Sequence, residues 1–375
     1  MSFPCAMSEV PLKYKIALSL IPRIGDINAR KLVSYIGSVE GVFTEPYRSL
    51  IKIPGIGANL ARYISERSYL SIAEKEAEYV EKNGIKTFFY LDNDYPYRLR
   101  QCEDSPVLFY FKGNCDLNAQ RILSVVGTRN ATSRGKEICE KIITGLAFDN
   151  PELVIVSGLA YGIDITAHKS AMANNLPTIG VLGHGFKTTY PSVHKPVANA
   201  MLKNGGLLTD FRSDELPERN NFIKRNRIIA GISDATLIVE SAITGGALIT
   251  ADIANSYNRD VFAIPGRIDD IWSAGCNNLI KRNKAALVES HEDIEYFLNW
   301  LPAKAKQPVQ RILFTELTED EKRIFELINK EEEINIDQIC RETGMPIHKL
   351  SNILLQMEFN GLIKSYPGNI YKIVY

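Results

Sequence analysis

Six short apolar segments, separated by helical runs, dominate the middle of the chain. Most of these segments are rich in Val, Ile or Thr, and several end at glycine or small polar residues, as buried parallel strands do. Between them lie runs of roughly ten to fifteen residues, long enough for one helix each. This alternation predicts a doubly wound parallel α/β sheet. The predicted strands are 123–127, 153–158, 178–183, 206–211, 235–241 and 260–265, preceded by two further strand-like segments, 85–91 and 107–111.

The front of the chain contains an internal repeat. Residues 21–32 (IPRIGDINARKL) and 53–64 (IPGIGANLARYI) share the frame I-P-x-I-G-x-x-x-A-R. Each copy predicts a helix, a tight glycine turn and a second helix, and resembles the helix-hairpin-helix motif, whose turn amides can hold a DNA phosphate. Two hairpins that only pack against each other are an equal alternative, because few cations lie near the turns. A charged helix over 71–83, with Ser71 as a possible N-cap, is expected to follow.

The tail has the pattern of a winged helix-turn-helix. Helices are predicted over 320–329, 335–343 and 347–360, and a hairpin over 362–374. Residues 311–375 hold eight Lys and Arg against eleven Asp and Glu. Since a DNA-reading helix needs phosphate-binding groups, we expect this tail to dock on protein instead. The predicted domains are a helical domain (1–83), an α/β domain (84–300), a linker (301–317) and the winged tail (318–375).

A basic stretch precedes the fifth predicted strand of the α/β domain. Four cations, Arg219, Lys224, Arg225 and Arg227, open a helical run, and Thr244-Gly245-Gly246 follows the strand. Ligands of open α/β sheets bind at the carboxyl ends of strands, where glycines let backbone amides approach phosphates. Either half alone is better explained by a solvated helix face or an ordinary turn. Together they predict a site for a polyanion.

Composition restricts the partners and the compartment. Lys and Arg (44) balance Asp and Glu (44), so attraction to nucleic acid must come from a local patch. The six cysteines form no CxxC pair, which gives no sign of a zinc site or a disulfide framework. The sequence shows neither a signal peptide nor an apolar run of the ~18 residues that a membrane span needs. We expect a cytoplasmic protein without membrane contact.

The sequence offers little for catalysis. Asp164 and His168 have the spacing of a general base or metal pair, but a helix-capping Asp164 and a packed His168 are favoured. Ser157 lacks the flanks of a hydrolase nucleophile, and no strand end carries G-x-G-x-x-G or a Walker lysine. We therefore predict no catalytic residue, no metal and no cofactor.

Several ordered motifs make the chain resemble the DNA-processing protein A (DprA/Smf) family. They are VVGTRNATSRG (125–135), VSGLAYGIDITAH (156–168), VLGHGFKTTYP (181–191), FIKRNRIIAG (222–231), GGALITA (245–251) and FAIPG (262–266). Thr128 and Asn283-Lys284 depart from the family pattern. The resemblance implies an extended Rossmann-like fold and a non-catalytic homodimer of natural transformation. Such a protein binds and protects incoming single-stranded DNA and helps load a RecA-type recombinase.

Motif positions imply a set of DNA-binding residues. The side chains implied to contact phosphates are Arg129, Lys195, Lys224, Arg225 and Arg227. The glycines implied to offer amides are Gly158, Gly245 and Gly246. Lys187 and Thr250 complete the predicted site together with Phe186, a candidate for base stacking.

Two alternatives stay open within this interpretation. For Tyr190, packing in the core is expected more than for Phe186. Because Lys224, Arg225 and Arg227 cannot share one helix face, one of them, most readily Arg227, is expected to pair with Asp210 or Glu240. A rival function is that of a nucleotide phosphoribohydrolase, a related Rossmann-like enzyme with the motif P-G-G-x-G-T-x-x-E. The turn at 244–250 lacks its second glycine and its glutamate.

Overall fold

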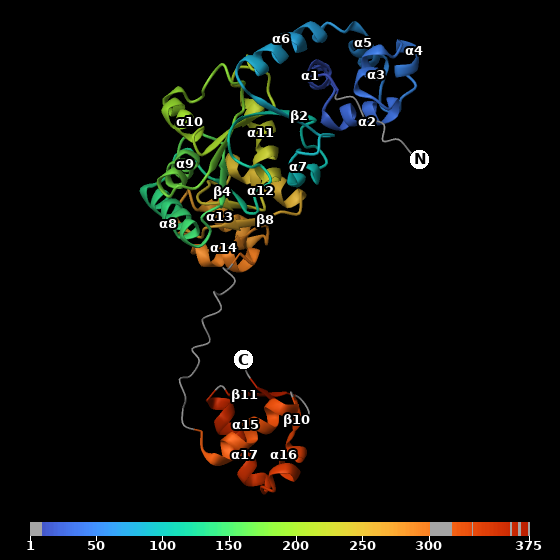
Figure 1. The fold of residues 1–375 in the computed structure, drawn as a ribbon. Coiled ribbons are helices and arrows are strands. Elements are labelled where there is room, and N and C mark those ends of the chain that lie inside the picture. The colour runs from blue at the N-terminus through green and yellow to red at the C-terminus, as the bar shows by residue number, and fades with distance from the viewer. Residues whose placement is uncertain (1–9, 301–316, 332, 361, 367–368, 374–375) are drawn as a thin grey trace, which may run out of the picture. The chain divides into compact units, whose positions relative to one another are not determined.

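A computed structural model describes residues 10–300, 317–331, 333–360, 362–366 and 369–373 (Figure 1). The chain divides into two compact units, Met1–Leu301 and Pro302–Tyr375. Among the described residues, no helix combines the length and the apolarity needed to cross a bilayer.

The first unit is built on a nine-stranded sheet in the order β1-β2-β6-β5-β4-β3-β7-β8-β9. From β6 to β9 all neighbours are parallel, which confirms the doubly wound sheet, and an antiparallel pair, β1 and β2, extends one edge. The sequence did not predict β9, which has only two residues. The strands are β1 (Lys86–Phe89), β2 (Leu108–Gly113), β3 (Ile122–Val126), β4 (Val154–Ser157), β5 (Thr178–Val181), β6 (Gly205–Thr209), β7 (Ala235–Ile238), β8 (Asp260–Ala263) and β9 (Ala286–Leu287).

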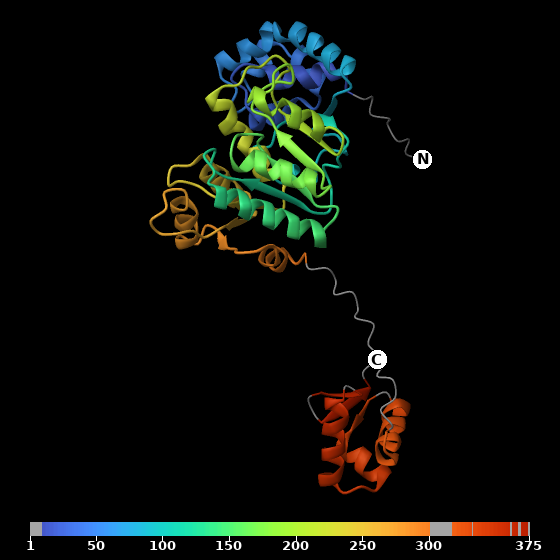
Figure 2. The same cartoon turned by 90° about the vertical axis from the view of Figure 1, so that its left-hand side faces the viewer.

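Helices cover both faces of this sheet (Figures 1 and 2). Side chains alternate along β3, so Leu123 and Val125 join one core while Ile122 and Val126 join the other. The first core packs against α8 (Ser133–Asp149), α9 (Ile163–Ala173) and α14 (His291–Leu298). The second packs against α7 (Tyr97–Arg100), α11 (Arg219–Ile232), α12 (Gly246–Ser256) and α13 (Ala274–Lys281); α10 (Lys195–Met201) adds a smaller cluster.

The front helices repeat one backbone turn. Gly25 and Gly57 have the same extended conformation before the second helix of each copy, and Arg23 and Gly55 take equivalent left-handed conformations (φ 61° and 88°). The internal repeat is therefore structural. Ser71 is not a cap, because the last front helix begins earlier, after Ser68. The helices are α1 (Leu12–Leu20), α2 (Asp26–Ile36), α3 (Val39–Thr44), α4 (Tyr47–Leu50), α5 (Ala58–Glu66) and α6 (Tyr69–Lys82).

The front helices share their hydrophobic core with the edge of the sheet. Phe89, Leu108 and Tyr110 of β1 and β2 pack in the same cluster as Ile16 and Leu32 of the helices. The helices and the sheet edge thus form one packed body.

The second unit is a winged helix, as predicted. Helices α15 (Glu319–Glu331), α16 (Ile336–Thr343) and α17 (Ile347–Phe359) pack on a sheet of β10 (Ile334–Asn335), β12 (Ile370–Ile373) and β11 (Ile363–Tyr366). The helix in the recognition position, α17, leaves Leu355 and Phe359 53% and 82% exposed. These two side chains are four residues apart and therefore share one helix face.

Candidate nucleic-acid interface

A cavity of about 590 Å³ opens where the strand order of the sheet reverses, between β3 and β7. Open α/β sheets bind ligands at this kind of position. Loops after β3, β4 and β7 and the first half of α11 form its walls. We call it the switch-point cavity; its principal lining residues are Gly127, Arg129, Ala160, Asp164, Tyr190, Arg219, Phe222, Ile223, Arg225, Asn226, Thr244, Gly246 and Thr250.

Cations and aromatic rings meet at this cavity. The Arg129 guanidinium lies 5.6 Å from the centre of the Phe222 ring, and the Tyr190 ring lies 5.6 Å from the same ring. Arg129 and Arg219 are exposed, so their charges face solvent. Such a surface offers phosphates a charge and bases a flat apolar face, which are the two groups that single-stranded nucleic acid presents.

The amino end of α12 also faces the cavity. Gly246 begins this helix and lines the cavity, and a side chain there would meet no neighbouring atom within 4 Å. The first amides of a helix have no acceptor within the helix, so they attract an anion. The Gly245 amide is already donated to the Ala242 carbonyl, and Thr250 lines the cavity as a buried residue.

Arg225 reaches the strand ends, but it lies inside the protein rather than on its surface. It is 4% exposed, and its Nη1 donates to the carbonyls of Gly158 (2.8 Å) and Val181. Burial lowers the pKa of Arg225 to about 10. A Cβ at Gly158 would lie 2.6 Å from Nη2, so glycine is required there to admit the guanidinium. Arg225 is thus first of all a brace between β4 and β5.

Asp164 completes this brace. The prediction that Asp164 caps its helix is wrong. The N-cap of α9 is Gly162, and the Asp164 carboxylate instead accepts from the amides of Gly158 (3.1 Å) and Ala160 (3.4 Å). Burial raises the pKa of Asp164, while Arg225 and these amides act in the opposite direction. The Gly158 amide is therefore engaged within the protein, which leaves it no proton for a phosphate.

His168 is packed in the core, as predicted. Its Nδ1 lies 2.7 Å from Thr178 Oγ1, and the residue is fully buried. Burial, helped by the positive charge of Arg225, lowers the pKa of His168 to about 3. The ring is therefore neutral at ordinary pH and has a structural place.

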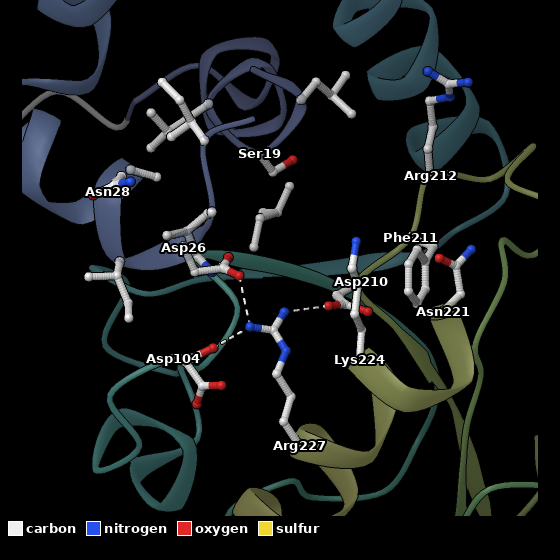
Figure 3. Close-up of a pocket in the computed structure, with 18 of the residues that line it drawn as sticks. Ser19, Asp26, Asn28, Asp104, Asp210, Phe211, Arg212, Asn221, Lys224 and Arg227 are labelled. Carbon is white, nitrogen blue, oxygen red and sulfur yellow. Dashed lines mark hydrogen bonds and ion pairs between the residues drawn. The ribbon is translucent and has the colours of Figure 1, made fainter. Parts of the chain in front are cut away.

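Arg227 forms the ion pair that the sequence suggested. Its Nη2 lies 2.6 Å from Asp210 Oδ2, and its Nη1 lies 2.8 Å from Asp26 Oδ2 of α2 (Figure 3). Glu240, the other suggested partner, instead accepts from the amide and hydroxyl of Thr132. Because Arg227 forms ion pairs with two carboxylates, its charge is not available to a phosphate, and the implied phosphate contact of Arg227 is not supported. Lys224 is exposed and lines a different cavity, next to the front helices.

Three other predicted residues lie outside the lining of the switch-point cavity. Phe186 is partly buried and packs against the front helical core, and Lys187 lies 4.9 Å from the Tyr79 ring. Lys195 is exposed at the start of α10. Tyr190, for which core packing is expected more than for Phe186, is instead 43% exposed and lines the cavity.

Further residues that line the cavity can be recognised from their spacing along α11. Arg219, Phe222 and Asn226 all line the cavity and stand three and four residues apart on α11. This spacing places them on one face. The run of cations alone does not point to Phe222 and Asn226, whereas their spacing along α11 does.

One group of possible metal ligands occurs among the described residues, away from this cavity. Asp149, His291 and Glu295 bring their ligand atoms within 4.8 Å of one another. His291 lies 3.6 Å from Asp149 of α8 and 3.1 Å from Glu292 of its own helix, and Glu295 accepts a hydrogen bond from Asn150, so contacts within the protein explain this group. We assign no metal to it.

The fold is that of a Rossmann-like α/β protein with a winged-helix tail. The chain belongs to the DNA recombination-mediator protein A family, whose pattern matches residues 86–299, and residues 313–369 match the DprA winged helix domain.

Known proteins are similar to this chain over most of its length. Protein Smf of Synechocystis is 31% identical over 98% of this chain and all of its own length. The solved structure of DNA processing protein A from Streptococcus pneumoniae is 34% identical, with a TM-score of 0.67, over 76% of this chain and 97% of that one. A structure describing the single-stranded DNA binding mode of the Helicobacter pylori protein is 26% identical, with a TM-score of 0.52, over 58% of this chain and 96% of that one.

Proposed function

We propose that this protein binds single-stranded DNA in the switch-point cavity, and so protects incoming DNA during natural transformation. The observation that carries the proposal is the contact of Arg129 with Phe222, beside the exposed Arg219. The single-stranded DNA binding described for the Helicobacter pylori relative supports it.

The cavity suits an unpaired strand better than a duplex. Arg129, Arg219 and the first amides of α12 take phosphates, and Phe222 and Tyr190 offer ring faces to bases. In a duplex the bases are stacked on each other and cannot reach such rings. Affinity for one strand should therefore depend little on base sequence, since every base has a flat face.

The protein partners belong to the same proposal. We infer a homodimer that helps load a RecA-type recombinase in the cytoplasm. The apolar face of α17, with Leu355 and Phe359 exposed, supports docking of the tail on protein. Exposed apolar side chains of this size are typical of protein contact sites.

A binding role accounts for the cavity better than an enzymatic one. The phosphoribohydrolase alternative needs a glutamate after the glycine turn, and residues 244–252 contain none. Among the described lining residues, Asp164 supplies the carboxylate, and its Oδ2 accepts hydrogen bonds from two backbone amides. A general base needs a lone pair directed at the substrate.

Fluorescence anisotropy with a labelled single strand and the duplex of equal length tests the proposal. We expect the single strand to bind more tightly, with an affinity that falls as salt rises. Equal binding of both at all salt concentrations, or binding of neither, would contradict it.

A further inference from the structure

A second cavity, of about 710 Å³, lies between the front helices and α11. Its walls are the α1–α2 turn, the loop after β6 and one side of α11 (Figure 3). We call it the front cavity. The lining residues used below are Asp26, Asp210, Phe211, Ile223, Lys224 and Arg227.

Lys224 provides an available charge at this cavity. Within the described ranges, its ammonium group enters no ion pair or hydrogen bond, and the side chain is exposed. The neighbouring cations are occupied, because Arg227 pairs with Asp26 and Asp210, and Arg212 pairs with Asp214. An anion that enters the front cavity therefore meets Lys224 first.

The wall beside Lys224 is polar and aromatic. Asp210 Oδ1 and Arg227 Nε are buried and have no hydrogen-bond partner. Unsatisfied polar atoms of this kind are uncommon in folded proteins and suggest a water or a ligand group. Phe211, partly exposed, adds a ring to the same cavity. A planar group such as a nucleobase can pack on this ring.

The front cavity borders the switch-point cavity. Ile223 lines both of them, with Arg219, Phe222 and Asn226 on one side of α11 and Lys224 on the other. A strand bound at Phe222 that crosses Ile223 arrives at Lys224.

Carboxylates in the front cavity decide how a nucleotide would lie there. Asp26 and Asp210 share the charge of Arg227, but Asp104 and Glu215 also line the cavity. Like charges repel, so a phosphodiester is disfavoured deep in the cavity and favoured next to Lys224. The base is the part that enters, toward Phe211.

We propose that the front cavity is a second subsite for single-stranded DNA, which takes the nucleotide that leaves the switch-point cavity over Ile223. Lys224 holds its phosphate and Phe211 contacts its base. The inference rests on the proposed function, because it extends the same bound strand.

Two variants of the full chain test this subsite with two lengths of oligothymidylate, about 6 and about 20 nucleotides. Lys224→Ala should change the affinity for the short strand less than about two-fold and weaken the long strand at least ~5-fold. Its salt slope with the long strand should fall by ~0.7, the value of one phosphate contact. Phe211→Leu should weaken only the long strand and leave its salt slope unchanged.

Lys203→Ala is the matched control, because Lys203 is an exposed lysine just before β6, at the end of this strand opposite to Asp210 and Phe211. It should behave as the parent with both strands. If the parent binds while Lys224→Ala matches it with the long strand, or weakens both lengths equally, the second subsite is refuted and the proposed function stands. If the parent binds neither strand, the proposed function fails, and this inference fails with it.

Discussion

Arg227 of α11 and Asp26, the first residue of α2, form an ion pair of 2.8 Å. The same guanidinium binds Asp210 after β6 and the Asp104 carbonyl, so it joins the first hairpin, the sheet and the helix that lines both cavities (Figure 3). The two copies of the internal repeat therefore differ. Asp26 and Arg30 of the first copy bind the α/β part, whereas the equivalent Ala58 and Arg62 of the second are exposed.

This contact predicts that Arg227→Ala costs stability. The side chain is 15% exposed, and its loss leaves Asp26 and Asp210 without their cation. We expect the free energy of unfolding to fall by about 3 kcal/mol, the lower end for a broken buried pair, because water partly screens it. Urea denaturation measures it. Arg62→Ala, at an exposed position, should change stability by less than about 0.5 kcal/mol; an equal loss in both variants would rule out a special role for Arg227.

The buried His168 predicts how stability depends on pH. The pKa of His168 is about 3 in the folded protein, whereas a histidine in an unfolded chain has a pKa of about 6.5, so the unfolded chain binds a proton that the folded chain does not. Stability is fully present above pH 6.5 and is lost as the pH falls below it, by about 1.4 kcal/mol per pH unit for each such proton. Arg225 and His194, which face this ring, add to the repulsion of a proton.

His168→Asn measures this contribution. The variant is expected to be less stable than the parent at pH 8. Its free energy of unfolding should fall less steeply between pH 6.5 and 4.5, and the difference between the two slopes should correspond to the binding of about one proton. Chemical denaturation at several pH values gives the two slopes. Parallel curves for the parent and the variant would show that His168 is not the group that titrates.

Phe222 and Phe186 should differ in their effect on DNA binding. Phe222 lines the switch-point cavity, whereas Phe186 packs against the front helices. Phe222→Leu should weaken single-stranded DNA binding by about 1–3 kcal/mol, the value of one stacked base. Phe186→Leu should leave DNA affinity unchanged. The reverse result in anisotropy titrations would restore the assignment made from the sequence.

The tail is expected to act on protein and not on DNA. Replacing Leu355 and Phe359 by Ser removes exposed apolar side chains without opening a cavity, so the fold should be retained. DNA affinity should match that of the parent, while binding to a RecA-type recombinase, measured by biolayer interferometry, should weaken. Reduced DNA binding with intact recombinase binding would instead make α17 a DNA-reading helix.

The sheet was predictable because local signals agree with the global fold. Apolar segments such as 123–127 carry both the strand pattern and the glycine that ends the strand, and neither depends on distant contacts. The two-residue β9 has no such pattern, since two residues show no period.

The candidate site was predicted only in part, because the burial of a side chain depends on which distant segments pack against its face of the helix. Helical spacing puts Arg225 on the side of Ile229, but it does not tell whether a guanidinium there finds carbonyls to bind. Gly158 and Val181, far away in the sequence, supply them. Phe186 and Tyr190 lie in a loop, where no periodicity separates an inward ring from an outward one.

The salt dependence of DNA binding by the Arg129→Ala, Arg219→Ala double variant tests the central claim most directly. Both side chains are exposed and line the switch-point cavity, so their loss should leave the melting temperature nearly unchanged. We predict weaker binding to single strands of every sequence and a salt slope reduced by ~1.4, or ~0.7 for each lost phosphate contact. An affinity and a slope equal to those of the Lys203→Ala control would contradict the account and place the DNA elsewhere.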